Sequence, residues 1–310
     1  MHTLRILTLV VTVTICLACS SGPLPERSPL HLRQSIRHLN KGTQLYTRGC
    51  YPHALRQFRQ AHERYMAADH LPGTAASLNS LANTYFRLND IPGALVIYDE
   101  AIEIYGLLND RAGQVRAMTN KSAALMAGGQ FEIAVTVLDQ ADKLAANKEL
   151  LAGLRLKTRA ILLMHRGEHP AAQGLLAQAL AATPPNAHAQ LAGVEYSLGH
   201  SLLNSRRPAQ AIAHFNAALE ADREIGAYNG IAQDLAALGD CRARMGQHGQ
   251  AVTYYKRSMQ QFALLQEVSR MEQVRAKLEE SARYAGADIQ AALQWVARWR
   301  AEEREANLCR

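Results

Sequence analysis

The chain repeats its own pattern with a period of about 40 residues, and this repeat limits the folds open to it more than any other feature. An alanine recurs in each unit at intervals of about 38–40 residues. These alanines are Ala54, Ala94, Ala134, Ala172, Ala211, Ala251 and Ala291. Seven units therefore tile the chain from about residue 35 to its end, and each must bury apolar surface against its neighbours.

Three further columns of this alignment share one kind of residue. The position four after each alanine is large and apolar: Phe58, Tyr98, Leu138, Leu176, Phe215, Tyr255 and Trp295. The position seven after it is small in six units: Ala61, Ala101, Ala141, Ala179, Ala218 and Ser258. The position twelve before it is also small in six units: Gly42, Ala82, Ser122, Ala160, Gly199 and Gly239. The seventh unit has Glu279 and Arg298 at the two small positions, as expected where the outer face of a terminal unit meets water.

A column of turn residues stands five positions before the alanines. Its members are Gly49, Asn89, Gly129, Gly167, Arg206, Gly246 and Gly286. Glycine can take a left-handed conformation and end a helix, so we expect each unit to be a helical hairpin that turns at this column. The small residues would let the paired helices approach to roughly 8–9 Å, and the large residue would fill the space between hairpins. Breaks between units are expected at Pro72-Gly73, Asn109-Asp110, Pro184-Pro185-Asn186 and Gly226.

This set of columns resembles the tetratricopeptide repeat family, which has small residues, a large aromatic or leucine side chain and a glycine turn at corresponding places. The resemblance covers residues 35–300 and implies an all-α fold, a right-handed α-solenoid of about seven stacked hairpins. The period exceeds the family's usual value of about 34 residues, which implies longer helices. Composition agrees, since Leu and Ala dominate and aromatic residues make up only 6%. We expect six repeats and a C-terminal capping repeat over residues 35–310.

Residues 1–18 differ from the repeats and are predicted to be a signal peptide. A basic start that ends at Arg5 is followed by an uncharged stretch over residues 6–18. This stretch is too short to remain as a transmembrane helix. Residues 19–34 contain Pro23, Pro25 and Pro29 and are expected to form a tether between the membrane and the solenoid.

The end of the signal peptide resembles the lipobox of bacterial lipoproteins, because Leu17 and Ala18 precede Cys19. The family prefers Leu three residues before the cysteine, where this chain has Cys16. The resemblance implies that Cys19 is acylated and, because Ser20 follows it, that the protein reaches the outer membrane and faces the periplasm. Cleavage without acylation, which would release a soluble secreted protein, is the alternative.

The remaining cysteines, Cys50, Cys241 and Cys309, are far apart and form no CxxC or Cys/His cluster. They allow no disulfide framework or zinc site to be predicted, and Cys309 is expected to be the most accessible of them because it lies near the chain end. The formal net charge is +7, but the basic residues are scattered among acidic ones and form no dense basic stripe. This distribution argues against nucleic-acid binding.

One motif raises the question of catalysis. Residues 165–169 spell H-x-x-E-H, with His165, Glu168 and His169 in the positions used by one class of zinc peptidases. That chemistry needs both histidines on one helix face. Gly167 falls in the turn column, so the two imidazoles are expected on different helices and the pattern is interpreted as coincidental. With no other catalytic motif present, we predict no enzyme activity, metal or cofactor, and keep a zinc-dependent hydrolase as the alternative.

In the tetratricopeptide family the first helix of each hairpin lines a concave groove, and the resemblance carries that role to certain columns here. They contain Asn79, Asn83, Arg87, Arg116, Thr119, Asn120, Lys157, Thr158, Tyr196, His200, Asn204, Gln233 and Arg244. Asn amides donate and accept hydrogen bonds, so a row of them could pair with the backbone of an extended peptide. Arg and Lys would favour an acidic segment or a C-terminal carboxylate. The expected function is a scaffold of the bacterial envelope that binds a partner protein, in outer-membrane, pilus or cell-wall complexes.

Overall fold

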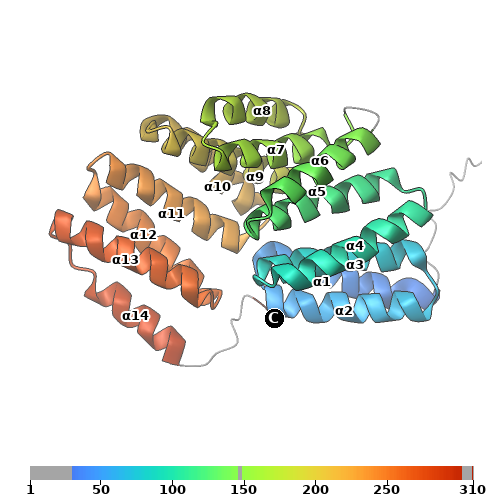
Figure 1. Cartoon of the computed structure of the whole chain (residues 1–310). Coiled ribbons are helices and arrows are strands. Elements are labelled where there is room, and N and C mark those ends of the chain that lie inside the picture. Colours follow the sequence, from blue (N-terminus) through green and yellow to red (C-terminus); the bar gives the residue numbers. More distant parts are fainter. Residues whose placement is uncertain (1–29, 146–148, 302–308, 310) are drawn as a thin grey trace, which may run out of the picture.

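The computed structural model describes residues 30–145, 149–301 and 309, and within them the chain is all-helical (Figure 1). A short 3-10 helix, Leu30–Leu32, precedes fourteen α-helices. The helices are α1 (Arg33–Arg48), α2 (Tyr51–Ala67), α3 (Leu71–Arg87), α4 (Ile91–Leu107), α5 (Arg111–Ala127), α6 (Phe131–Leu144), α7 (Ala152–His165), α8 (His169–Ala181), α9 (His188–Asn204), α10 (Pro208–Glu224), α11 (Tyr228–Arg244), α12 (His248–Leu264), α13 (Val268–Ala285) and α14 (Gln290–Ala301). The prediction of an α-solenoid of helical hairpins is confirmed.

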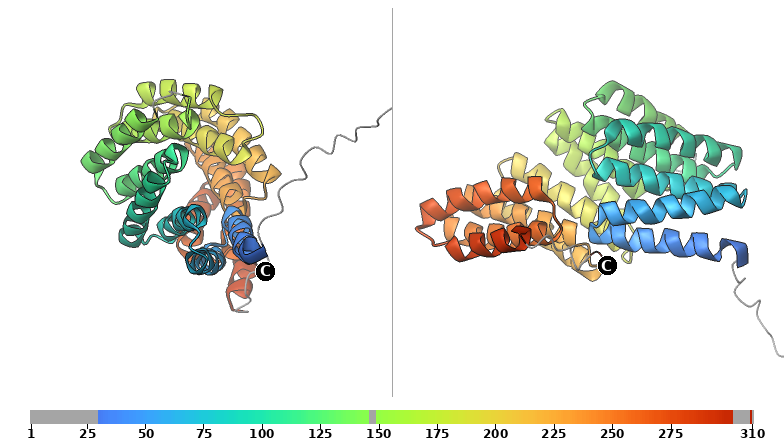
Figure 2. Two further views of the ribbon diagram at one scale, coloured as in Figure 1. Left: turned by 90° about the vertical axis from the view of Figure 1, so that its right-hand side faces the viewer. Right: turned by 90° about the horizontal axis from the view of Figure 1, so that it is seen from below.

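The hairpins stack into a strongly curved array. Each helix from α1 to α12 packs against the next, and the odd-numbered helices from α1 to α11 also contact one another in sequence, so that they form one layer. Figure 2 shows the array bending round until its two ends lie beside each other. The curvature is tight enough for α1 to contact α11. The solenoid therefore closes on itself after about six hairpins.

The turn column behaves as predicted in all seven units. Every member has a positive φ, from +59° at Arg206 to +87° at Gly49. Left-handed residues also separate successive hairpins, at Asn109 and Gly226 among others. The expected break at Pro72-Gly73 is wrong by a few residues, because the left-handed residue is Asp69 and Pro72 lies in the first turn of α3. Proline is tolerated there because the first backbone N–H groups of a helix have no partner within it.

The large and small columns meet inside each hairpin. A Cβ atom added to Gly42 would lie 2.6 Å from the ring of Phe58, and the same relationship joins Gly199 to Phe215 and Gly239 to Tyr255. These aromatic rings are buried, and they occupy the volume that a side chain on the facing helix would need. The prediction that the large residue lies only between hairpins is therefore incomplete, since it first fills the inside of its own hairpin.

The seventh unit departs from the alignment by one position. Ala291 and Trp295 are exposed, the latter by 51%, whereas Ala292 and Val296 are buried against α13 and α12. In α13 the buried small residues are Ser281 and Ala282 instead of Glu279. Gly286 still lies in the turn column, so the shift of α14 arises after it, in the connection that leads to Gln290.

The start of the array lies slightly earlier than expected. Leu32, assigned to the tether, is buried with Ala61 and Tyr65, so the solenoid includes the last residues of the predicted 19–34 segment. The predicted signal peptide over residues 1–18, Cys19 and most of the tether lie outside the described residues. Among the described helices, none is both long and apolar enough to span a membrane.

The cysteines contradict one expectation. Cys309 forms a disulfide with Cys50 and is only 6% exposed, so the prediction that it is the most accessible thiol is wrong. The bond joins positions 259 residues apart and packs against Leu45, Phe58 and other side chains of the first hairpin. Cys241 is free and buried in α11.

Candidate functional site

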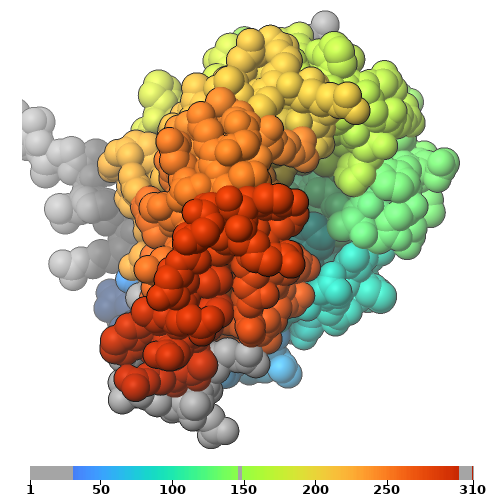
Figure 3. Space-filling model, turned by 90° about the vertical axis from the view of Figure 1, so that its left-hand side faces the viewer, coloured from blue at the N-terminus to red at the C-terminus, as the bar shows by residue number. Residues whose placement is uncertain are grey.

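A cavity of about 470 Å³ lies on the concave side of the array and is called the central cavity here. Every odd-numbered helix from α1 to α11 contributes side chains to it, whereas α4 adds only Tyr98. Its lining includes Tyr46, Asn83, Arg87, Asn120, Lys157, Thr158, Tyr196 and Gln233. Figure 3 shows the surface hollowed between the orange C-terminal helices and the green and cyan ones. One continuous space is thus accessible to six of the seven hairpins.

Seven of the thirteen groove residues predicted above line this cavity directly, and an eighth lines a neighbouring one. The seven are Asn83, Arg87, Asn120, Lys157, Thr158, Tyr196 and Gln233. His200 lies in an adjoining space of about 240 Å³ that Tyr196 and Gln233 also border. The structure therefore gathers residues from five different hairpins, which are far apart in sequence, around one space.

Three of the remaining predicted residues lie elsewhere. Asn79 is buried behind the lining, where its Oδ1 atom accepts a hydrogen bond of 3.4 Å from Asn120. Arg116 and Asn204 are exposed and do not border the central cavity. The lining part of α5 begins at Asn120, and that of α9 ends at residue 197, so only one stretch of each helix faces the cavity.

Thr119 and Arg244 also differ from expectation. Thr119 is buried and its hydroxyl donates to the carbonyl of Val115, so its polar group is satisfied within its own helix. Arg244 is exposed and donates to the carbonyl of Leu203, which closes the end of a neighbouring helix. Both side chains serve the packing of helices and do not line the central cavity.

The polar groups of the central cavity retain hydrogen-bonding capacity. Asn83 accepts a 2.6 Å hydrogen bond from the hydroxyl of Tyr98, which fixes its carbonyl and leaves its NH₂ group without a partner within the described part of the chain. Lys157 makes no ion pair with any described residue, and burial together with the nearby Arg87 lowers the pKa of its ammonium group. Burial also raises the pKa of the Tyr46 hydroxyl to about 12, so it stays a neutral donor. The site can donate hydrogen bonds to carbonyl or carboxylate oxygens.

The prediction missed a second group of polar residues, which comes from the far end of the array. A cavity of about 290 Å³ beside the central one is bordered by Asp222, Asn229 and Asp234 together with Arg87. Burial raises the pKa of Asp222 to about 6 and, with Asp222 nearby, that of Asp234 to about 9. Asp234 is therefore protonated at neutral pH. No column pattern marks these positions, because only the curvature of the whole array places them beside α1 and α3.

Arg87 connects the two ends of the array. Its Nε and Nη2 atoms donate to the Tyr51 hydroxyl at 2.9 and 2.6 Å, and Nη2 also donates to Oδ1 of Asn229 at 3.1 Å. Arg270 of α13 donates to the same oxygen at 3.0 Å. Beyond these groups lies a larger cavity of about 780 Å³, which is called the closure cavity here. It is bordered by the α1–α2 and α3–α4 turns on one side and by the α12–α13 turn on the other.

The H-x-x-E-H motif spans the turn between two helices. Helix α7 ends at His165 and α8 begins at His169, with Gly167 at a φ of +78° between them. His165 lies against the ring of Phe131 at 5.2 Å and borders the central cavity. The two imidazoles do not share the single helix face that the zinc-peptidase pattern requires, and the described residues contain no group of three potential metal ligands.

Comparison with known proteins identifies the repeat. The protein-family model described as "Tetratricopeptide repeat" matches residues 34–107 and 190–262. No curated protein sequence gives a significant match. A Rap protein solved in complex with Competence and Sporulation Factor has a TM-score of 0.57 and 13% identity, over 86% of this chain and 76% of that one.

Two further solved structures resemble shorter parts of the array. A thermophilic tetratricopeptide repeat protein of Thermus thermophilus is 23% identical, with a TM-score of 0.49 over 66% of this chain and 98% of its own. Pseudomonas aeruginosa pilF is 16% identical, with a TM-score of 0.44 over 74% and 97%. The matched repeats, together with the hairpin columns and the solenoid they build, make this chain a member of the tetratricopeptide repeat family.

Proposed function

We propose that the protein is a non-catalytic scaffold that binds an extended segment of a partner protein in its central cavity. The observation that carries this proposal is the lining of that cavity by polar and aromatic side chains from α1, α3, α5, α7, α9 and α11. Asn83, Asn120 and Gln233 offer amides that can pair with a peptide backbone whatever its sequence. A segment lying along the cavity would contact each hairpin in turn.

The fold comparison is consistent with such a role. The Rap protein, which resembles this chain over most of its length, was solved in complex with Competence and Sporulation Factor. Solenoids of this kind bind partners on surfaces that many repeats share. No described feature favours the zinc hydrolase alternative, since His165 and His169 belong to different helices.

We also propose that the scaffold is attached to the bacterial envelope through an acylated Cys19 and faces the periplasm. The sequence around Cys19 carries this part of the proposal. The Cys50–Cys309 disulfide supports it, because disulfides persist in oxidising compartments and are rare in the cytosol. In that location the partner would be a protein of an envelope complex, such as an outer-membrane, pilus or cell-wall assembly.

Site-specific photocrosslinking in native envelopes tests the binding role. Benzoylphenylalanine placed at position 120 or 157 should crosslink one partner, and mass spectrometry should map the adduct to a single extended stretch of it. The control is position 257 on α12, where Arg257 is exposed and lies outside the central cavity. The same adducts at 257, or none at 120 and 157, would show that binding occurs elsewhere.

A further inference from the structure

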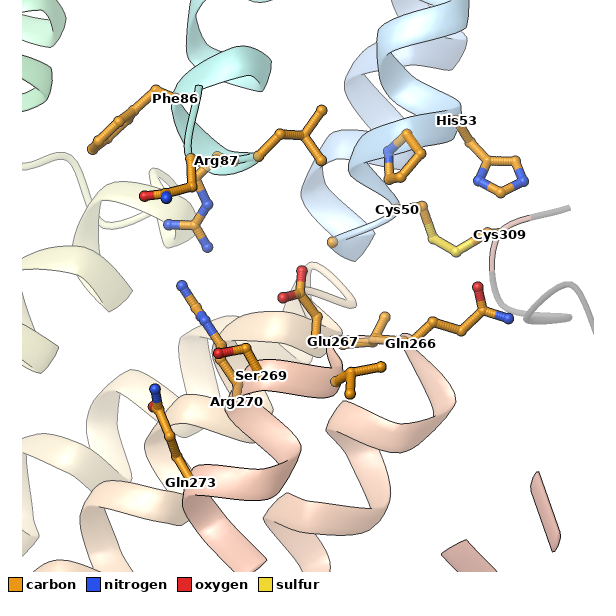
Figure 4. A pocket seen from close by; sticks show the side chains of 16 residues that line it. Cys50, His53, Phe86, Arg87, Gln266, Glu267, Ser269, Arg270, Gln273 and Cys309 are labelled. Carbon is orange, nitrogen blue, oxygen red and sulfur yellow. A yellow bond between two sulfur atoms is a disulfide. The ribbon is translucent and has the colours of Figure 1, made fainter. Parts of the chain in front are cut away.

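The closure cavity contains two arginines from opposite ends of the array that point toward each other (Figure 4). Arg87 ends α3 and Arg270 lies in the first turn of α13. Both donate to Oδ1 of Asn229, at 3.1 and 3.0 Å, so one oxygen atom lies within hydrogen-bond distance of both guanidinium groups. Two positive charges are thus held close together by one amide oxygen.

Glu267 and Asp222 act on Arg87 electrostatically, but no carboxylate among the described residues holds either guanidinium group in an ion pair. Glu267 borders the same cavity. The neutral oxygen of Asn229 already receives both guanidinium groups and the side-chain amide of Gln233. Asn229 is only 2% exposed, and its own Nδ2 atom is buried without a partner among the described residues. This polar cluster has more donors than acceptors.

The two guanidinium groups are also held in place. The hydroxyl of Tyr51 accepts two hydrogen bonds from Arg87, whose guanidinium carbon lies 5.0 Å from the centre of the Tyr51 ring. Arg270 lies over the ring of Phe262 at 6.0 Å. Contacts of this kind fix the direction of the remaining N–H groups, and both arginines border a cavity of about 780 Å³. A guanidinium fork matches the two oxygens of a carboxylate, and positioned forks bind it more strongly than mobile ones.

We propose that Arg87 and Arg270 together bind a carboxylate of the partner segment at the point where the array closes on itself. This inference rests on the proposed function, since the segment in the central cavity would extend past Arg87, which borders both spaces. A groove site is formed by hairpins that are neighbours in sequence, whereas the two arginines of this site come from the second and seventh hairpins. The carboxylate is either the C-terminus of the segment or an acidic side chain within it.

Three fluorescein-labelled octapeptides made of Gly, Ser and Ala test the proposal by fluorescence anisotropy. One ends in a free carboxylate, one ends in an amide, and one ends in an amide but carries a single internal Glu. The free-carboxylate or the Glu peptide should bind about tenfold or more tightly than the uncharged amide, and which of them does so identifies the source of the carboxylate. Equal binding of all three, or binding of none, would overturn the proposal.

Substitutions then assign the effect to the two arginines. Arg270→Gln and Arg87→Gln should each remove most of the preference for a carboxylate, whereas Arg257→Gln makes the same change of charge outside the cavity and should preserve it. Arg87→Gln also removes the contact with Tyr51. If this variant has a lower melting temperature than the wild type, the result for Arg270→Gln alone decides the test. Equal losses for Arg257→Gln and Arg270→Gln would show a net-charge effect and refute the site.

The outcomes also separate this inference from the proposed function. Partner crosslinks at positions 120 and 157 that persist unchanged in Arg270→Gln, with no carboxylate preference among the peptides, would refute the inference and leave the scaffold role intact. A carboxylate preference that depends on Arg270, without partner crosslinks at those positions, would leave the anion site and refute partner binding in the central cavity.

Discussion

Cys50 and Cys309 join the turn of the first helical hairpin to the C-terminal end of the chain, across 259 positions of sequence. The residue after Cys50 is Tyr51, whose hydroxyl accepts hydrogen bonds from Arg87. Figure 4 shows the disulfide at one side of the closure cavity, with Arg87 and Arg270 further in. The covalent link and the Arg87–Asn229–Arg270 cluster therefore hold the same two ends of the array together.

Removing this link should destabilise the fold. In a solenoid each hairpin is stabilised mainly by its neighbours, so terminal hairpins open first unless they are joined. We expect Cys309→Ser to lower the free energy of unfolding by about 2–4 kcal/mol in urea denaturation followed by circular dichroism. Reductant should lower the stability of the wild type by a similar amount and leave Cys309→Ser unaffected. A non-reduced peptide map without a Cys50–Cys309 linkage would contradict the premise.

The pairing of Gly199 with Phe215 gives a second test, now of the packing inside a hairpin. A Cβ atom at Gly199 would lie 2.6 Å from the Phe215 ring, which is fully buried and packs against the rings of Tyr196 and His200. Gly199→Ala should therefore lower the free energy of unfolding by about 1–3 kcal/mol. Gly174→Ala is the matched control, because no described atom lies within 4 Å of the added Cβ on α8. That change should raise stability by roughly 0.5–1 kcal/mol, and a loss of similar size in both variants would rule out the packing explanation.

The hairpins could be predicted from sequence because their determinants are local. Gly42 and Phe58 lie in one hairpin, and the same contact recurs in other units, so the alignment of columns shows it repeatedly. The column predicts the turn at Arg206 even though arginine rarely takes a positive φ. The predicted register of the last unit is wrong because an extra residue between Gly286 and α14 changes the phase, and no later unit reveals the change.

The concave residues are predictable only in part, for a related reason. Asn120 and Lys157 lie on first helices of their hairpins, and the column rule places such residues on the inner layer. Which stretch of each helix borders a cavity depends on the angle between hairpins, so Arg116 lies outside the cavity although its helix lines it. Asn229, Arg270 and the disulfide come together through curvature accumulated over several repeats, which the period of the sequence does not encode.

The anchor at Cys19 is the third prediction. If the proposed anchor is present, cells fed an alkynyl palmitate should label the wild-type protein, and Cys19→Ser should abolish the label because the proposed acyl acceptor is the mature N-terminal cysteine. Cys16→Leu supplies the control, since it places the preferred Leu three residues before Cys19 and should retain the label. Label that persists in Cys19→Ser, or release of the unlabelled wild type into the soluble fraction, would favour the secreted alternative.

The fourth prediction concerns Asp234, a carboxyl group that is 1% exposed and has one buried oxygen without a partner among the described residues. Burial, and second the nearby Asp222, raise its pKa from 3.8 to about 9, so the folded protein keeps a proton there that the unfolded chain releases above about pH 4. Stability should therefore fall as pH rises from about 4 to about 9, because over that range the folded state binds more protons than the unfolded state. Asp234→Asn, which remains neutral, should flatten this slope and raise the free energy of unfolding at pH 8 by at least about 1 kcal/mol. Urea denaturation at pH 5 and pH 8 measures both effects. If stability falls with pH as steeply in Asp234→Asn as in the wild type, other groups cause the pH dependence. The first of these is Asp222, whose pKa is raised to about 6.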